Sequence, residues 1–204
     1  MLDRRIFLGL LAGLPSLAAQ VQAARAQAAQ ASESSDADAA LAVVRALQDS
    51  QVEVLSHATK MSLQQRFDAL RPALGAAFDL DGMAKLAYGP GFDALPEREA
   101  WTQSFGDYVA ATYAQRLEFV ESKGFERDAK VEPRDGALVV GTRMIPLKGE
   151  PMPIDYVVKS TPHGWRIADI LANGSISELT QWRRALKGLA LKDLRQRVAS
   201  LLGR

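Results

Sequence analysis

The sequence predicts an α+β fold in which a small antiparallel sheet of about four strands is wrapped by about six helices. Three segments, 138–145, 154–160 and 165–171, are rich in Val, Ile, Met, Tyr and Trp and are separated by the turn-forming sequences KGEPMP and TPHG. Segments with helical periodicity stand before and after them. Because so few strands cannot close a barrel, one face of the sheet must be buried under helices.

The N-terminus is typical of an export signal. Arg4 and Arg5 precede an apolar run over residues 6–19, and small residues suited to cleavage follow at 21–26. The run has about 14 residues, whereas a membrane-spanning helix needs about 20, so a signal peptide over residues 1–26, cleaved near 23–26, is favoured over an anchor. The stretch RRIFL resembles the twin-arginine signal core, although ordinary export signals also carry two arginines.

Charge and cysteine content exclude several classes of function. Removal of residues 1–26 leaves 22 of the 25 basic and 23 of the 24 acidic residues, so the mature chain has no basic excess for nucleic acid. The absence of cysteine excludes disulfides, thiolate metal sites and a cysteine nucleophile. Residues 27–38 are small and polar and are expected to form a flexible lead. Residues 39–204 can form one domain.

Four helices are expected before the strands. Apolar residues at helical spacing predict the first over about 39–58. Ser62 and Gln65 form a capping box at the start of the second, and Asp79 can cap a short third helix that ends at the Gly-Pro-Gly corner 89–91.

The fourth helix follows Pro96 and carries a largely aromatic face. Its inward positions are Trp101, Phe105, Tyr108, Val109, Thr112, Tyr113, Leu117 and Val120. These side chains could simply pack against the sheet, or they could leave room for an apolar ligand. Periodicity alone does not separate the two readings.

The remaining elements surround the three main strands. Residues 125–132 alternate imperfectly and are expected to form a fourth, edge strand. Ser175 and Glu178 form a second capping box, which predicts a helix that ends at Gly188. A last helix over about 191–201 carries a narrow apolar stripe and a basic outer face.

Motifs for chemistry are nearly absent. His57 and His163 lack metal-ligand spacing, Ser175 and Ser177 lack a nucleophile elbow, and no glycine-rich phosphate loop is present. Asp155 and Asp169 lie in strands, where they could act as acid and base in a cone-shaped α+β enzyme or could be structural. Asp169 ends the last strand, where a carboxylate commonly binds backbone amides. We therefore expect no catalytic residue, metal or cofactor.

The order and spacing of many short motifs resemble the MlaC, or toluene-tolerance, family of periplasmic lipid-binding proteins over about residues 40–203. The matching residues are Arg66-Phe67, Phe78-Asp79, Met83-Ala84, Tyr88-Gly89, Phe105, Tyr108, Tyr113-Ala114, Arg116-Leu117, Ile154-Asp155-Tyr156, Gly164-Trp165-Arg166-Ile167, Asp169 and Asn173-Gly174-Ser175-Ile176-Ser177.

The resemblance implies a non-enzymatic, monomeric periplasmic shuttle that carries phospholipid between an outer-membrane lipid-handling complex and an inner-membrane ABC transporter. Two positions depart from the family pattern: Phe92 stands where Trp is usual, and residues 173–178 replace the common E-G-V-S. The second departure resembles the hopanoid-associated HpnM branch, so a hopanoid is the alternative ligand.

A lipid carrier needs an apolar cavity between sheet and helices, lined by adaptable methionine and aromatic side chains. The lipid-binding candidates, chosen by face and residue type, are Phe105, Tyr108, Tyr113, Leu117, Met144, Tyr156 and Trp165. Two other classes of function stay open: a structural adaptor with a filled core, and an enzyme that uses Asp155 or Asp169.

Overall fold

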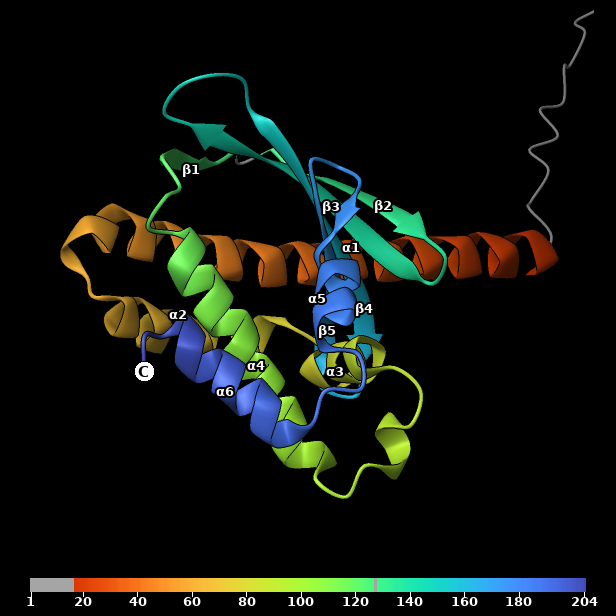
Figure 1. Ribbon diagram of the computed structural model, residues 1–204. Coiled ribbons are helices and arrows are strands. Elements are labelled where there is room, and N and C mark those ends of the chain that lie inside the picture. The colour runs from red at the N-terminus through yellow and green to blue at the C-terminus, as the bar shows by residue number, and fades with distance from the viewer. Residues whose placement is uncertain (1–16, 127) are drawn as a thin grey trace, which may run out of the picture. The chain divides into compact units, whose positions relative to one another are not determined.

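The computed structural model describes residues 17–126 and 128–204, and an antiparallel sheet of six strands organises the part from Ala37 onward. Three long strands form its centre: β3 (Ala137–Pro146), β4 (Met152–Thr161) and β5 (Gly164–Ala172) pair in sequence order. Figure 1 shows this meander with the helices gathered around it. The α+β class predicted from the sequence is thereby confirmed.

The expected fourth strand over residues 125–132 is instead two short strands. The strand β1 (Ser122–Phe125) pairs with one end of β3, and β2 (Lys130–Arg134) pairs with the other end along the same edge. The two-residue strand β6 (Ile176–Ser177) adds to β5. The estimate of about four strands was therefore too low, because interrupted edge strands carry little alternation in the sequence.

The six α-helices of the described residues follow the predicted order. Their bounds are α1 (Leu17–His57), α2 (Leu63–Ala77), α3 (Leu80–Tyr88), α4 (Arg98–Arg116), α5 (Glu178–Leu186) and α6 (Leu191–Leu201). Short 3₁₀ turns, η1 (Ala58–Lys60) and η2 (Phe92–Ala94), follow α1 and α3.

The predicted signal peptide falls mostly on residues 1–16, which lie outside the described part. The flexible lead expected at 27–38 differs from the structure, which places these residues within α1. Their composition explains the difference, since Ala, Gln and Glu are strong helix formers even where they pack against nothing. The chain divides after Asp36, so the description below concerns residues 37–204.

Two of the predicted caps are confirmed and one is displaced. Ser62 and Gln65 form the reciprocal capping box of α2, and Asp79 accepts a hydrogen bond from the amide of Gly82 at the start of α3. The helix α5 begins two residues later than expected, because Ser177 rather than Ser175 caps it. Strand β6 occupies the intervening residues.

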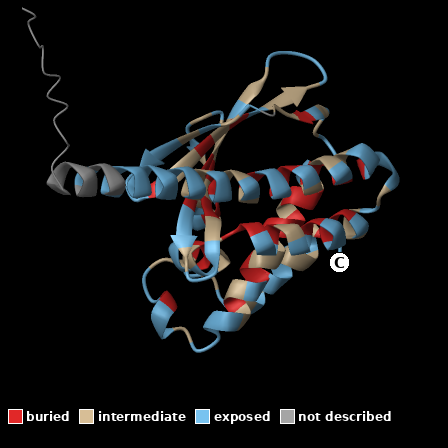
Figure 2. Cartoon of the chain, turned by 180° about the vertical axis from the view of Figure 1, so that it is seen from behind, coloured by how far each residue is buried: buried red, intermediate tan, exposed pale blue. Residues whose placement is uncertain are grey.

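Helices α2 and α6 both pack on α4, and α3 and α5 pack together beside β5. One buried side chain, Arg66, ties this arrangement together: it donates to the carbonyls of Ala58, Met61 and Ala114 and pairs with Glu118 at 2.6 Å. Figure 2 shows the buried residues concentrated where the helices face one another and the strands. No helix among the described residues is long and apolar enough to cross a membrane.

Candidate functional site

The aromatic residues of the core form one continuous series rather than separate contacts. The Trp101 and Phe105 rings stack with centroids 5.8 Å apart. Phe105 then meets Trp182 edge-on at 5.9 Å, and Phe78 lies 6.4 Å from both Trp182 and Tyr113. The series runs from α4 through α5 and back to α4, and it forms the apolar interior of the helical layer.

The series ends at Tyr113, whose phenol group is buried. Burial, reinforced by the negative charge of Glu178, raises the pKa of the Tyr113 phenol well above its ordinary value. Glu178 is paired with Arg116 on α4. On β4, burial raises the pKa of Tyr156 to about 12, so both phenols are neutral at physiological pH.

Tyr156 belongs to a hydrogen-bonded group that joins the sheet to α1. The amide nitrogen of Gln48 donates to the Thr142 hydroxyl at 3.1 Å and to the Tyr156 hydroxyl at 3.3 Å. Thr142 in turn donates to the carbonyl of Ile154 at 3.0 Å. The three side chains are no more than 6% exposed, so they place hydrogen-bonded polar atoms in the largely apolar interior.

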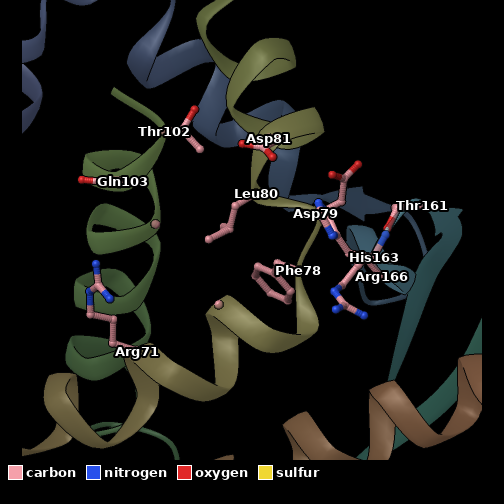
Figure 3. Close-up of a pocket in the computed structure, with 12 residues that line it drawn as sticks. Arg71, Phe78, Asp79, Leu80, Asp81, Thr102, Gln103, Thr161, His163 and Arg166 are labelled. Atoms are coloured by element: carbon pink, nitrogen blue, oxygen red, sulfur yellow. The ribbon is translucent and has the colours of Figure 1, made fainter. Parts of the chain in front are cut away.

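A hollow of about 320 Å³ lies among α2, α3, α4 and the β4–β5 turn (Figure 3). Phe78, the residue that contacts Tyr113 and Trp182, lines it together with Leu80. Several of its charged groups already have partners: Arg71 pairs with Asp107, Asp79 caps α3, and Arg166 donates to the carbonyl of Trp165. Phe78 therefore separates the hollow from the aromatic series and contacts both.

A second hollow, of about 180 Å³, lies between α1 and strand β1. Its walls include Gln48 and Thr142, so it reaches the polar group that contains Tyr156. Charged residues also line it, among them Arg45 of α1, Lys123 of β1 and Glu126, which directly follows β1.

The structure brings some of the predicted lipid-binding residues together. Tyr113 and Tyr156 are both buried, and the electrostatic interaction between their phenol groups contributes to the raised pKa of Tyr113. Phe105 connects to them through Trp182 and Phe78, and Leu117 is buried one turn beyond Tyr113.

The other three candidates are half-buried and lie further out. Tyr108 and Trp165 pack against the edge of the core. Met144 lies near the end of β3, on the same face as Val140 and Thr142.

Sequence reasoning missed Gln48, Thr142, Phe78 and Trp182 as parts of this region. A signal for Gln48 was present, since it falls among the apolar residues Val44, Leu47 and Val54 on the buried face of α1. A polar residue at such a position marks either a structural hydrogen bond or a binding site.

Asp169, one of the two acid–base candidates, has the surroundings of a structural carboxylate. Asp169 accepts hydrogen bonds from the amides of Ile170 and Leu179 at 2.8 and 3.0 Å and from the Ser177 hydroxyl at 2.6 Å. It therefore fixes the connection from β5 to α5, as the sequence predicted. No group of three or more potential metal ligands occurs in the part of the chain that the structure describes.

A small antiparallel sheet covered on one face by helices, with an aromatic interior, is an architecture suited to holding an apolar molecule. Comparison with known proteins identifies the family: residues 24–192 match the MlaC protein family, and the chain belongs to it. No curated protein sequence matches the chain.

Among solved structures, the chain is similar to a phospholipid-binding protein from Ralstonia solanacearum, determined in complex with a phospholipid. The two share 22% sequence identity with a TM-score of 0.62, over 79% of this chain and 98% of the other. This similarity shows a common fold, and the predicted family is confirmed.

Proposed function

We propose that this protein is a periplasmic carrier that holds the apolar part of a phospholipid between its sheet and its helices. The observation that carries the proposal is the family match over residues 24–192, together with a fold shared with a protein that was determined with a bound phospholipid. The continuous aromatic series from Trp101 to Tyr113 supplies an interior of the required chemistry.

The energetics of such an interior suit transfer rather than storage. Each buried methylene contributes roughly 0.8 kcal/mol, so about ten of them contribute about 8 kcal/mol, close to what a bilayer provides for the same atoms. Exchange between protein and membrane is then nearly neutral. A shuttle requires this balance, because it must take up lipid from one partner and release it to another.

Buried side chains, among them Trp101, Phe105 and Trp182, occupy the interior, so lipid uptake would require an element to move. The best candidate is the part of α1 from Ala37 onward. The backbone of α1 is less closely packed against other elements than that of α4, which packs on α2 and α6. Side chains such as Gln48 connect α1 to the sheet by hydrogen bonds. Displacement of α1 would expose Thr142 and Tyr156 and open the space between sheet and helices.

The wider role follows from the family and the N-terminal sequence. An export signal over residues 1–26 would deliver the mature domain, 39–204, to the periplasm, by the twin-arginine or the general route. There it would exchange phospholipid with an outer-membrane lipid-handling complex and with an inner-membrane ABC transporter. A hopanoid remains the alternative ligand, since residues 173–178 resemble that branch of the family.

The proposal is tested by the lipid content of the mature protein, purified from its native envelope without detergent and examined by native mass spectrometry and organic extraction. We expect bound phospholipid. A hopanoid instead would support the alternative branch, and lipid-free protein from a lipid-rich envelope would count against a carrier. Lipid-free protein with a cavity at Asp155 or Asp169 would favour an enzyme.

A pair of neighbouring variants locates the lipid. Met144 lies on the inward face of β3 and Arg143 is exposed, so Met144→Lys and Arg143→Lys place the same side chain on opposite sides of the sheet. We expect the first to lower lipid occupancy at an unchanged fold and the second to leave occupancy unaltered. Equal occupancy in both variants would place the ligand away from this face.

A further inference from the structure

The part of α1 that faces the sheet carries two buried glutamines, Gln48 and Gln51, which are 6% and 5% exposed. They are three residues apart and therefore lie on one face of the helix, among Val44, Leu47 and Val54. The side-chain carbonyl oxygen of Gln51 is buried and has no hydrogen-bond partner within the described residues. Such an atom is costly, since an unpaired buried acceptor forfeits about 1 to 3 kcal/mol.

The neighbouring hydrogen bonds fix the direction in which Gln48 presents its amide. Thr142 gives its only hydroxyl proton to the carbonyl of Ile154, so it must accept the bond from the Gln48 nitrogen. The Gln48 nitrogen also donates to the Tyr156 hydroxyl. The carbonyl oxygen of Gln48 takes no part in these bonds.

Tyr156 complements the two glutamines. Its hydroxyl oxygen accepts from Gln48, which leaves its own proton available to donate, and the phenol stays protonated because burial raises its pKa to about 12. The region therefore presents both a donor, on Tyr156, and acceptors, on Gln48 and Gln51. A hydroxyl group can both accept and donate, so it is the simplest partner for this set.

The region also has a route to solvent. Gln48 and Thr142 line the 180 Å³ hollow between α1 and β1. A ligand that enters between α1 and the sheet would bring its polar part to this place, with its apolar part toward Tyr113 and the aromatic series.

From this arrangement we infer that Gln48, Gln51 and Tyr156 form a binding subsite for a hydroxyl group of the bound lipid. The inference rests on the proposed carrier function and adds to it a preference for lipids that carry a hydroxyl group. Acyl chains and their esters carry no O–H donor, so they leave the buried Gln51 oxygen unpaired. The hydroxyl could belong to a glycerol headgroup or to a ring alcohol.

Two matched pairs of probe lipids test the subsite and separate these sources. Mature protein freed of lipid is incubated with phosphatidylcholine vesicles that contain equal amounts of phosphatidylglycerol and phosphatidylmethanol, which share charge and tails and differ in the headgroup hydroxyls. A second set of vesicles contains cholesterol and its methyl ether. Bound lipids are then identified by native mass spectrometry.

We expect the hydroxyl-bearing member of one pair to be bound at least about five-fold in excess, equivalent to one net hydrogen bond. Preference within the first pair assigns a headgroup hydroxyl, and preference within the second assigns a ring hydroxyl. Equal uptake within both pairs overturns the subsite while the carrier function stands. A protein that takes up no lipid at all overturns the proposed function itself.

The variant Gln51→Leu distinguishes a binding role from a structural one. If the glutamine serves the ligand, its replacement removes the preference while the unfolding temperature of the lipid-free protein stays the same or rises, because an unpaired buried acceptor is lost. Gln196→Leu, which changes an exposed glutamine of α6, is the control and keeps the preference. A Gln51→Leu protein that keeps the preference overturns the inference, whatever its stability.

Discussion

At the scale of single residues, the most unusual feature is a pair of neutral, buried phenols between the sheet and α4. Tyr156 is 2% exposed and held by Gln48, and Tyr113 lies near it beside Glu178. Burial disfavours the charged phenolate, and this raises the pKa of both tyrosines. This property gives the stability of the domain a distinct dependence on alkaline pH.

We predict that the free energy of unfolding falls as pH rises from about 10 toward 12. The unfolded chain loses the Tyr156 proton near pH 10, whereas the folded protein retains it until about pH 12, so the stability from the raised pKa is present below 10 and lost through this window. The shift corresponds to about 2 to 3 kcal/mol. Chemical denaturation at a series of pH values measures it.

The variant Tyr156→Phe removes this ionisation and should reduce the alkaline dependence, of which the part due to Tyr113 would remain. Tyr108→Phe, which alters a half-buried tyrosine of the same helical layer and leaves Tyr156 in place, should keep the slope of the wild type. A Tyr156→Phe slope as steep as that of the wild type would mean that the phenol ionises freely in the folded state.

At the scale of elements, Arg66 connects η1, α2 and α4 through one buried guanidinium. Arg66 is only 4% exposed. Its guanidinium donates to three backbone carbonyls and pairs with Glu118. Arg71, one turn further along α2, pairs with Asp107 from a side chain that is 50% exposed. The two arginines therefore provide a natural comparison between buried and surface ion pairs.

Arg66→Ala should lower the free energy of unfolding by about 3 to 5 kcal/mol, because it leaves buried carbonyls without donors. Arg71→Ala should cost less than about 1 kcal/mol, since solvent screens its exposed pair. Thermal or denaturant unfolding of the two variants measures the difference. Similar losses in both would show that the carbonyls bonded to Arg66 find other donors.

The elements also show what the sequence could and could not predict. Strong periodicity and caps such as Ser62 and Asp79 located α2, α3 and α4 closely. The start of α5 was wrong because both Ser175 and Ser177 suit a cap, and only the pairing of β6 with β5 decides between them. The edge strands β1 and β2 were merged because β1 pairs with the far end of β3, distant in the sequence, whereas β2 forms a hairpin with the near end.

The candidate site was harder to predict than the fold. The aromatic face of α4 was evident from spacing, and Tyr156 was chosen as a candidate from its place in an expected strand. The partners lie on other elements: Gln48 on α1, Phe78 directly after α2 and Trp182 on α5. Local sequence patterns do not reveal which of these elements contact one another. Their contribution depends on the tertiary packing.

At the scale of the whole molecule, the proposed carrier function would require the domain to open. In the structure, Trp101, Phe105 and Trp182 are buried and pack together in the interior. Adaptable aromatic contacts without disulfides permit repacking around a guest. The lipid would then take the place of contacts that the protein makes with itself.

The central claim, that lipid lies between the sheet and the helices, is tested most directly by a crystal structure of the mature protein purified with its native lipid. We expect continuous density for acyl chains or a ring system in contact with Tyr113, Leu117 and Tyr156, with α1 moved away from Thr142. Lipid density only on the outer surface, with these side chains packed as described above, would contradict the account.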